Sequence, residues 1–487
     1  MNTRRQIIRG AVSSGGGVAF SIVALLVVGK VAATHLSPAE LAVFALLLLS
    51  ADFLNLLSNL GLTPTTAKLI GAAIGDPEKR RVISTGLFGQ LGMSFAFAAI
   101  VIGTRYWLPD GFPTDAKWQR MMPYFWLLPP LFVVGTLRDL AMAALAGFNR
   151  YAHRAAGLVI TSALQIGLVL TLALTCGASV ATLVGALLAA YGAALIFFLA
   201  GLRDAFQVRP SPTLYIGHLR LSAPLYANSL TAFFLQRFDT VLLLALLDAP
   251  SAAIYEMAKR LPAVLSRVMG AFLVPYLPSV AEFIAKDQRP KASDLLTQAF
   301  ALTAVAGYSV ALGTILVQEH LILLLFSAEF LPTTTVLGLL LGATCLLVQS
   351  GIMGQSLLAL GHAGLIVAVN VVLAGVGIAL NIVLIPRMGM LGAALVGIAI
   401  AGASCLLQGC CVRWKGLAPD SWRCLTPTVL FVGAMAAIHV TNFNPWMRIA
   451  AFTAFVLLSF RLGAVTVVQV REILTHLVPV ARSPRLP

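Results

Sequence analysis

The chain has 487 residues, of which 59% are hydrophobic and only 10% are charged, with a mean hydropathy of +0.93. Ordinary soluble domains carry about 25% charged residues, so this composition excludes a soluble enzyme or a soluble binding module. The net charge of +15 would fit a nucleic-acid binder, but the placement of the charges along the chain argues against that class.

Apolar runs of about 20 residues, the length needed to cross a bilayer core, follow one another along the whole chain. The connections between them are short. The sequence therefore predicts an all-α integral membrane protein with about 14 transmembrane helices. The predicted spans are residues 11–33, 38–60, 82–104, 121–147, 154–175, 180–201, 221–246, 252–278, 293–317, 332–358, 363–384, 389–411, 425–441 and 445–462.

Lys and Arg residues are unevenly distributed over the loops between these spans. With the N-terminus in the cytoplasm, 22 of the 33 fall inside, five fall outside and six lie within spans. Cytoplasmic loops of membrane proteins carry such an excess of positive charge, so both termini are expected in the cytoplasm. The basic composition then reflects topology, and no nucleic-acid partner is expected.

Polar residues in the first two spans are the first candidates for a site. Lys30 lies near the outer end of the first span, where a lysine can also simply reach the lipid headgroups. Asp52, Asn55 and Asn59 fall within a stripe of about 60° on the second span, and Asp52 is close to the midplane. This stripe is expected to face a polar cavity.

The fourth and seventh spans each carry an arginine and an aspartate close together. Arg138 and Asp139 lie near mid-depth in the fourth span, where they either neutralise one another or take part in function. Arg237 lies near mid-depth in the seventh span, and Asp239 is about 200° away around the helix. These last two residues cannot both face one cavity squarely.

The eighth span, which reads "IYEMAKRLPAVLSRVMGAF" from Ile254, is the most charged. Glu256, Lys259, Arg260 and Arg267 fall within about 100° of arc around the helix. A charge at the bilayer centre costs at least about 2.5–3.5 kcal/mol, so this face must contact water or a partner. A water-filled cavity is favoured over a closed set of ion pairs, because pairing Glu256 with Arg260 leaves Arg267 without a local partner.

The charges within spans sum to an excess of two positive charges, six against four. A cationic cavity attracts an anionic ligand, and arginine binds phosphate oxygens in a bidentate manner. The acidic residues are candidates for binding a coupling cation or proton. The candidate substrate-binding residues are Arg237, Arg260, Arg267, Lys259, Arg138 and Lys30. The coupling-ion candidates are Asp52, Asp239, Glu256 and Asp139, and the polar residues expected to line the cavity are Asn55, Asn59, Asn228 and Gln236.

Two halves of the chain resemble each other at a nearly constant offset. Phe44 aligns with Tyr255 at an offset of 211, and "CGASVATLVG" ending at Gly185 aligns with "MGMLGAALVG" ending at Gly397 at 212. Parallel repeats are a transporter architecture with the substrate site between the halves. The predicted domains are an N-terminal six-helix bundle at 1–206, its repeat at 207–412, and two extra transmembrane helices with a cytoplasmic tail at 413–487.

Catalytic motifs are missing from the sequence. The outer loops at 105–120 and 318–331 are short and contain only scattered acidic residues and one histidine. The cysteines lack metal-binding spacing, and no Walker-type glycine loop is present. We therefore expect neither enzymatic activity nor a metal or other cofactor.

Two long motifs carry a resemblance to a known family. They are "FDTVLLLALLDAPSAAIYEMAKRLPAVL" from Phe238, followed by Pro275 and Pro278, and "LNIVLIPRMGMLGAALVGIAIA" from Leu380. With the fourteen spans, they make the chain resemble the polysaccharide repeat-unit (O-antigen or exopolysaccharide) flippases of the multidrug/oligosaccharidyl-lipid/polysaccharide exporter superfamily. The resemblance covers essentially the whole chain.

The resemblance implies a flippase of the bacterial inner membrane that carries undecaprenyl-diphosphate-linked sugars from the cytoplasmic to the periplasmic leaflet by alternating access. Arg237, Arg260 and Arg267 would then hold the diphosphate, and a proton or sodium gradient would drive transport. Membrane lipids are expected partners, as are a polysaccharide polymerase and chain-length proteins.

Three alternatives stay open at this point. A lipid II flippase of the same superfamily would carry the same diphosphate lipid, so charge cannot separate the two. A multidrug or cation antiporter of the superfamily is disfavoured by the two extra helices and the cationic excess. A membrane polymerase or ligase is disfavoured by the short outer loops.

Overall fold

A computed structural model describes residues 3–465 except 74, 108–118, 149, 176, 204–209, 274–275 and 442–443. Within these ranges the chain is almost entirely helical and forms no strand. The prediction of an all-α membrane protein is confirmed. The predicted domain boundary at 206–207 and the tail after residue 465 lie outside the described residues, and the division into two repeats stays a prediction.

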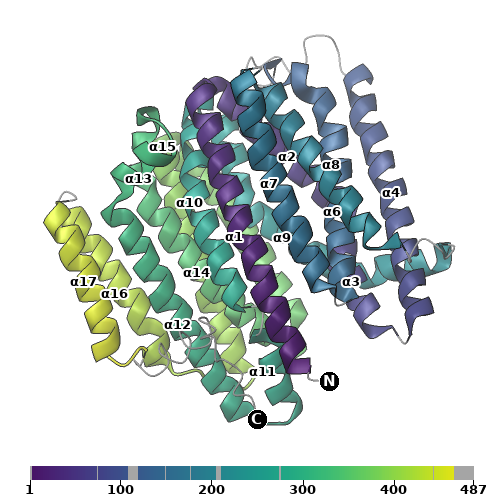
Figure 1. The fold of residues 1–487 in the computed structure, drawn as a ribbon. Helices are drawn as coiled ribbons and strands as arrows, with labels where there is room; N and C mark the ends of the chain where they lie inside the picture. Colours follow the sequence, from purple (N-terminus) through teal and green to yellow (C-terminus); the bar gives the residue numbers. More distant parts are fainter. Residues whose placement is uncertain are drawn as a thin grey trace, which may run out of the picture. The chain divides into compact units, whose positions relative to one another are not determined.

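The helices follow one another with short connections (Figure 1). The first nine elements are α1 (Thr3–His35), α2 (Pro38–Asn59), α3 (Leu62–Ala72), α4 (Asp76–Trp107), η1 (Met122–Leu127), α6 (Leu128–Gly147), α7 (Tyr151–Thr175), α8 (Val180–Ala200) and α9 (Pro212–Leu246). The others are α10 (Ala249–Leu273), α11 (Tyr276–Ala285), α12 (Arg289–Leu316), α13 (Gln318–Leu325), η3 (Ala328–Thr333), α14 (Thr334–Ala359), α15 (Ala363–Trp414), α16 (Ser421–Val440) and α17 (Pro445–Arg461).

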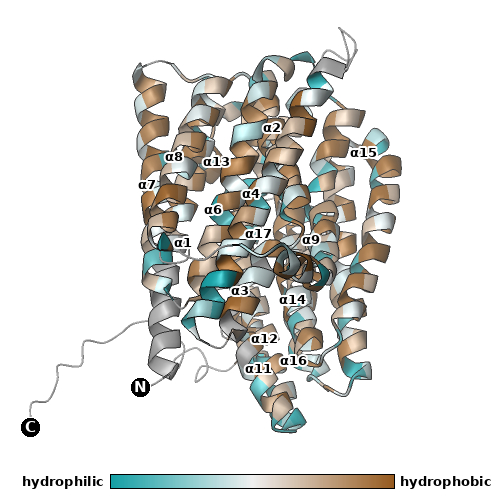
Figure 2. Ribbon diagram, turned by 90° about the vertical axis from the view of Figure 1, so that its right-hand side faces the viewer, coloured by the Kyte–Doolittle hydropathy of each residue, from teal (hydrophilic) through white to brown (hydrophobic). Residues whose placement is uncertain are grey.

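Ten helices in the described part of the chain are long and apolar enough to cross a membrane. The other predicted spans also coincide with helices, but α1, α10 and α17 are too charged or too short to meet the same criterion. Helix α10 contains four charged residues, α17 has 17 residues, and the apolar part of α1 starts at Ala19. Helix α15 contains two predicted spans in one element. Figure 2 shows that hydrophobic residues cover most of the helical surface.

The two predicted spans inside α15 are separated by a sharp local break. Gly389 has φ 61° and ψ −138°, a non-helical conformation with positive φ that glycine adopts readily. Pro386, three residues earlier, removes a helical hydrogen bond. The segment "IPRMG" therefore ends one helix and starts the next, so α15 consists of two helices joined at a kink.

The chain forms two units, each compact in itself. The first contains residues 1–260, 322–333 and 370–396, and the second contains 261–321, 334–369 and 397–487. The division between units falls inside α10, directly after Arg260.

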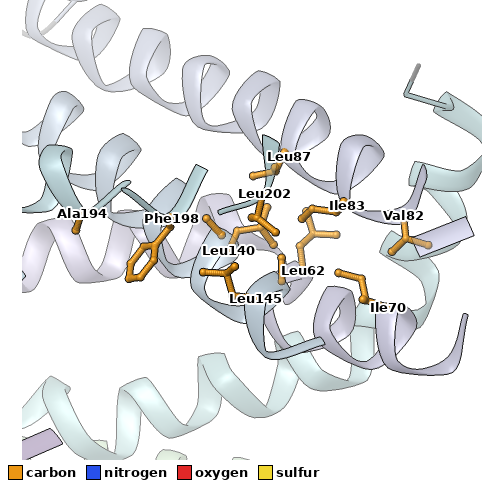
Figure 3. Close-up of a cluster of buried hydrophobic side chains, with 12 residues drawn as sticks. Leu62, Ile70, Val82, Ile83, Leu87, Leu140, Leu145, Ala194, Phe198 and Leu202 are labelled. Atoms are coloured by element: carbon orange, nitrogen blue, oxygen red, sulfur yellow. The ribbon is translucent and has the colours of Figure 1, made fainter. Parts of the chain in front are cut away.

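The first unit has an apolar core where α3, α4, α6 and α8 meet. Buried side chains from these four helices interlock there (Figure 3). Apolar packing of this kind fixes the position of α6, the helix that carries Arg138 and Asp139. The core residues are Leu62, Ile70, Val82, Ile83, Leu87, Leu140, Ala141, Ala144, Leu145, Ala194, Phe198 and Leu202.

Helix α7 packs closely on both of its neighbours in this unit. A Cβ placed on Gly17 of α1 would lie 3.1 Å from the Cβ of Leu158, and one placed on Gly157 would lie 2.0 Å from the ring of Phe198 in α8. The two glycines thus permit helix spacings that larger residues would prevent.

The second unit packs its C-terminal helices around an aromatic cluster. Tyr308 of α12 stacks on Phe431 of α16, with ring centroids 4.4 Å apart, and meets Phe455 of α17 edge-on at 6.3 Å. The Tyr308 hydroxyl lies 3.3 Å from the hydroxyl of Thr428. This cluster attaches α16 and α17 to α12.

Candidate functional site

Six charged residues of the first unit gather on α2, α9 and α10, within the membrane-spanning part of these helices. We call this group the charge cluster. It consists of Asp52, Arg237, Asp239, Glu256, Lys259 and Arg260. The six residues, which carry three positive and three negative charges, differ greatly in how tightly they are held.

Asp239 and Lys259 form the tight part of the cluster. The Lys259 ammonium lies 2.7 Å from Asp239 Oδ1 and donates to the backbone carbonyl of Gln236 at 2.8 Å. Asp239 Oδ2 accepts a hydrogen bond of 2.8 Å from the Tyr255 hydroxyl. The two charged side chains are only 17% and 16% exposed. This buried, fully hydrogen-bonded pair attaches α10 to α9, and breaking such a pair is strongly destabilising.

Arg237 is held loosely by comparison. Its Nη1 lies 3.8 Å from Glu256 Oε1 and its Nη2 lies 4.0 Å from Asp52 Oδ2, whereas charged hydrogen bonds are about 2.7–2.9 Å long. The side chains of Arg237 and Asp52 are 43% and 59% exposed. The guanidinium thus lies between two carboxylates without being fixed by either.

Arg237 lies deep in the membrane-spanning part of α9, far from the end of the helix. The residue lies nine positions before Leu246, the end of α9, which is about 14 Å of helix and about half the thickness of a bilayer core. A charged side chain at that depth faces the protein interior or water rather than lipid. By this principle we expect the exposed surfaces of Arg237 and Asp52 to face water.

Arg260 is held in a third manner, by backbone instead of by an acid. Its side chain is buried, and Nη1 donates to the carbonyl of Leu25 in α1 at 3.0 Å. A Cβ on Gly29 would lie 2.3 Å from Nη1 and 3.1 Å from Cζ of Arg260. Gly29 thus creates the slot in α1 that the guanidinium fills.

The other predicted arginine–aspartate pair is closed on itself. Asp139 Oδ1 accepts from Arg138 Nη2 at 2.6 Å and from Nε at 2.9 Å. The Arg138 guanidinium also lies 4.0 Å above the ring of Tyr191, a cation–π geometry. Asn55 Nδ2 donates to Asp139 Oδ2 at 3.3 Å, which connects α2 to α6.

The remaining predicted residues lie outside the charge cluster. Lys30 donates to the carbonyl of Leu324 at 2.8 Å, at the C-terminal end of α13, where a helix dipole favours a cation. Asn59 caps the start of α3 through Thr63, its Oδ1 accepting from the Thr63 backbone N–H at 3.0 Å.

Asn228 and Gln236 lie on α9, and Arg267 lies on α10. Asn228 Oδ1 accepts from Asn370 Nδ2 at 3.2 Å, and the Gln236 side chain is exposed. Arg267 belongs to the second compact unit, where its side chain is exposed. The structure thus brings six of the predicted charges together in the first unit, with the Arg138–Asp139 pair within electrostatic range of Asp52.

Several contributors to the site were missed by sequence reasoning. Tyr255 and Thr240 hydrogen-bond to acidic residues of the cluster, Tyr191 stacks on Arg138, and Gly29 accommodates Arg260. For two of these residues, the sequence offered one indication, namely that they adjoin predicted acidic residues: Thr240 follows Asp239 and Tyr255 precedes Glu256. Nothing in the sequence marks Tyr191 or Gly29, because their roles depend on helices that are distant along the chain.

The charge cluster presents groups that can bind an ion or an anionic ligand. In the described residues no group of three or more His, Cys, Asp and Glu side chains is placed to hold a metal ion. What the cluster offers is an exposed guanidinium between two carboxylates at mid-depth. Such a guanidinium can exchange its loose carboxylate contacts for the oxygens of an anionic ligand.

The fold defines a class of protein: a multi-pass α-helical membrane protein. The fold is similar to that of the lipid II flippase MurJ in an inward closed conformation, with a TM-score of 0.71 and 14% identity over 96% of this chain and 100% of MurJ. It is also similar to an inward-facing multidrug resistance MATE family transporter of the MOP superfamily, with a TM-score of 0.66 and 14% identity over 81% of this chain and 95% of that protein.

A third similar structure is a MOP superfamily transporter from Pyrococcus furiosus described as having a binding pocket of reversed polarity. Its TM-score is 0.64 at 15% identity, over 85% of this chain and 95% of that protein. At these identities the similarities establish the fold.

Sequence comparison identifies the family. A family model described as "Polysaccharide biosynthesis protein" matches residues 31–335, more than half of the chain, and the protein belongs to that family. The probable low-salt glycan biosynthesis flippase Agl15 of Haloferax volcanii is 23% identical over 167 residues, which is 34% of this chain and 35% of that relative. The aligned segment thus spans about a third of the relative. These relatives are flippases and transporters rather than enzymes.

Proposed function

We propose that the protein is a flippase that moves undecaprenyl-diphosphate-linked oligosaccharides from the cytoplasmic to the periplasmic leaflet of the bacterial inner membrane by alternating access. The family and the similarity to flippases support transport of a lipid-linked sugar. The excess of 22 positive loop residues over five supports cytoplasmic termini. The polymer is an O-antigen or an exopolysaccharide, passed on to a polymerase and chain-length proteins.

The observation that carries this proposal is the loose pairing of Arg237. Its contacts of 3.8 and 4.0 Å and its exposed fraction of 43% leave its hydrogen-bond donors free to turn to a new partner. A diphosphate supplies strong acceptor oxygens at the spacing of a guanidinium fork. The lipid tail would remain in the bilayer while the headgroup lies at the charge cluster.

We also propose coupling to a proton or sodium gradient, which the same geometry supports. When a phosphate binds the Arg237 guanidinium, the two carboxylates beside it lose their shared cation. Asp52 and Glu256 can then bind a proton or a sodium ion. We rank these two above Asp239 and Asp139, which stay paired with Lys259 and Arg138. Driving force and substrate binding would thus compete for one guanidinium.

Flipping can be measured in proteoliposomes with a fluorescent undecaprenyl-diphosphate oligosaccharide and a membrane-impermeant quencher. Arg237→Ala is expected to lower the initial rate at least about tenfold, the loss typical of one charged hydrogen bond. Arg203→Ala, which removes an exposed arginine outside the cluster, is the matched control and should leave the rate unchanged. A normal rate for Arg237→Ala would remove the basis of the proposal.

The same assay separates the alternatives. Equal rates for lipid II and for the oligosaccharide lipid, with complementation of a strain depleted of its lipid II flippase, would assign the protein to peptidoglycan synthesis instead. Cation-driven export of a cationic dye without flipping of either lipid would assign it to multidrug antiport. Only flipping restricted to the oligosaccharide lipid agrees with the proposal.

A further inference from the structure

The second unit contains an apolar groove on α16. It lies along the first half of α16 and against the residue after α17, and it has a volume of about 480 Å³. The residues that line it are Ser421, Trp422, Leu425, Thr426, Val429, Leu430 and Leu462. All of them except Ser421 and Thr426 are apolar. The Thr426 hydroxyl donates a hydrogen bond of 2.6 Å to the backbone carbonyl of Trp422. The groove therefore suits a hydrocarbon chain.

The opposite faces of α16 and α17 are already used by the protein. Phe431 and Phe455 pack against Tyr308 of α12, which leaves the groove on the outer side of the two helices. Val429 and Leu425 are 66% and 51% exposed there. The lining from Ser421 to Leu430 extends over about 14 Å of helix, a large part of the length of a phospholipid acyl chain.

Positive charge surrounds one end of this groove. Arg413 lies in the last turn of α15 and donates through Nη2 to the Pro419 carbonyl at 3.2 Å and to the Ser421 hydroxyl at the groove. Its Nε and Nη1 make no hydrogen bond within the described residues, and the side chain is exposed. Arg461 is exposed at the end of α17, next to Leu462.

Other nearby groups keep the charge balance positive. Residues 413–423 contain Arg413, Lys415 and Arg423 and one acid, Asp420. With Arg461, this gives four positive charges and one negative charge around the end of the groove. The Asp420 carboxylate is directed to the N-terminus of α16, where it accepts from the Trp422 and Arg423 backbone N–H groups.

Tryptophans mark the same level of the membrane. Trp414 and Trp422 are 72% and 63% exposed, and the Trp422 indole donates to the Leu462 carbonyl at 3.2 Å. Exposed tryptophans are typical of the membrane–water interface. The charged end of the groove is thus at headgroup level, on the side that the charge distribution assigns to the cytoplasm.

We propose that this groove is a binding site for an anionic glycerophospholipid of the inner leaflet. One acyl chain would fill the apolar groove, and the phosphate would contact Arg413, Arg461 and the Ser421 hydroxyl. Basic sites at helix ends on the cytoplasmic side bind such headgroups, and the guanidinium fork matches phosphate oxygens. This site is independent of the transport cluster and does not rest on the proposed function.

Native mass spectrometry of the full chain can test the site with phosphatidylglycerol and phosphatidylcholine of equal chain length. Selective retention of phosphatidylglycerol is expected, and Arg413→Gln with Arg461→Gln should reduce it about tenfold. Arg81→Gln with Arg203→Gln removes the same charge from exposed arginines that do not line the groove and should change nothing. Val429→Trp, which fills the groove, should reduce retention while leaving the charge intact. Equal retention of the two lipids, or equal effects of the two double variants, would overturn the proposal.

A photo-crosslinker in place of Val429 identifies the occupant in native membranes. An adduct with phosphatidylglycerol supports the site. An adduct with a polyprenyl phosphate would assign the groove to the transported lipid, and an adduct with residues 466–487 would assign it to the chain itself. Either of those two results would contradict the proposal.

Discussion

Replacing Gly29 by alanine tests whether the buried guanidinium of Arg260 depends on the slot in α1. The added Cβ would lie 2.3 Å from Nη1 and 3.2 Å from Cδ of Arg260, so the side chain must move. Moving it breaks the 3.0 Å hydrogen bond to the Leu25 carbonyl. The guanidinium then loses its partner while its surroundings stay closed.

Two opposing effects decide the sign of the change. Within a helix, replacing glycine by alanine stabilises the fold by about 0.8–1.0 kcal/mol. Loss of a hydrogen bond from a charged group costs about 1.5–3 kcal/mol. The loss is larger, so Gly29→Ala is expected to lower the free energy of unfolding by about 1–2 kcal/mol. Helix propensity alone predicts the opposite sign.

The assay is equilibrium unfolding in mixed detergent micelles, performed as a double-mutant cycle with Arg260→Met. In the Arg260→Met background the obstacle is gone, and Gly29→Ala should become stabilising by about 1 kcal/mol. Gly167→Ala is the matched control, because a Cβ there has no heavy atom within 4 Å, and it should stabilise in both backgrounds. If Gly29→Ala stabilises the protein with Arg260 present, or if the cycle is additive, the slot does not hold the guanidinium.

Three further predictions concern the charges. Lys259→Met or Asp239→Asn alone should destabilise the protein by about 3–5 kcal/mol in the same unfolding assay, because each leaves the partner's charge unpaired. The double variant should be destabilised much less. Equal losses of stability in the single and double variants would show that the two side chains do not act as an ion pair. Burial lowers the pKa of His218, which precedes the apolar span of α9. Its contribution to stability is therefore complete above about pH 6.5 and decreases below that pH. His218→Leu should remove this decrease from the free energy of unfolding measured between pH 7.5 and 5.5, and an unchanged pH profile would refute the prediction. Arg260→Ala or Arg267→Ala should abolish polymer export, measured as polymer at the cell surface, while the protein remains folded and inserted; normal polymer from both single variants and from the double variant would exclude a role for these arginines in transport.

The helices themselves could be predicted from the sequence, because a bilayer imposes a minimum length on apolar runs. Even the break in α15 was visible as the separation between two predicted spans. What the sequence did not show is that "IPRMG" joins the two helices of α15 through a kink at Gly389 and not through a loop. Whether a Pro-Gly segment gives a loop or a kink depends on the packing around it, which the sequence does not specify.

The partners of the charged residues could not be predicted in the same way. Helical phase indicates which side of α9 carries Arg237 or Asp239, but it does not say which residues of α2 and α10 approach that side. In the structure Arg237 approaches Asp52 and Glu256, while Asp239 takes Lys259 and Tyr255. Pairings between helices depend on their crossing and depth, which are properties of the packed bundle.

Counting charges also treats every arginine in a span as equivalent, and the contacts here separate them. Arg138 is closed on Asp139 and Tyr191, Arg260 fills a slot made by Gly29, and Arg237 contacts two acids only at 3.8–4.0 Å. An anionic ligand must compete with the existing partners of the residue it binds, so the weakest pairing is displaced at the lowest cost. By this criterion Arg237 is the first residue of the charge cluster that a diphosphate would engage. The Arg260 slot would instead govern how firmly α1 is attached to α10 while that happens.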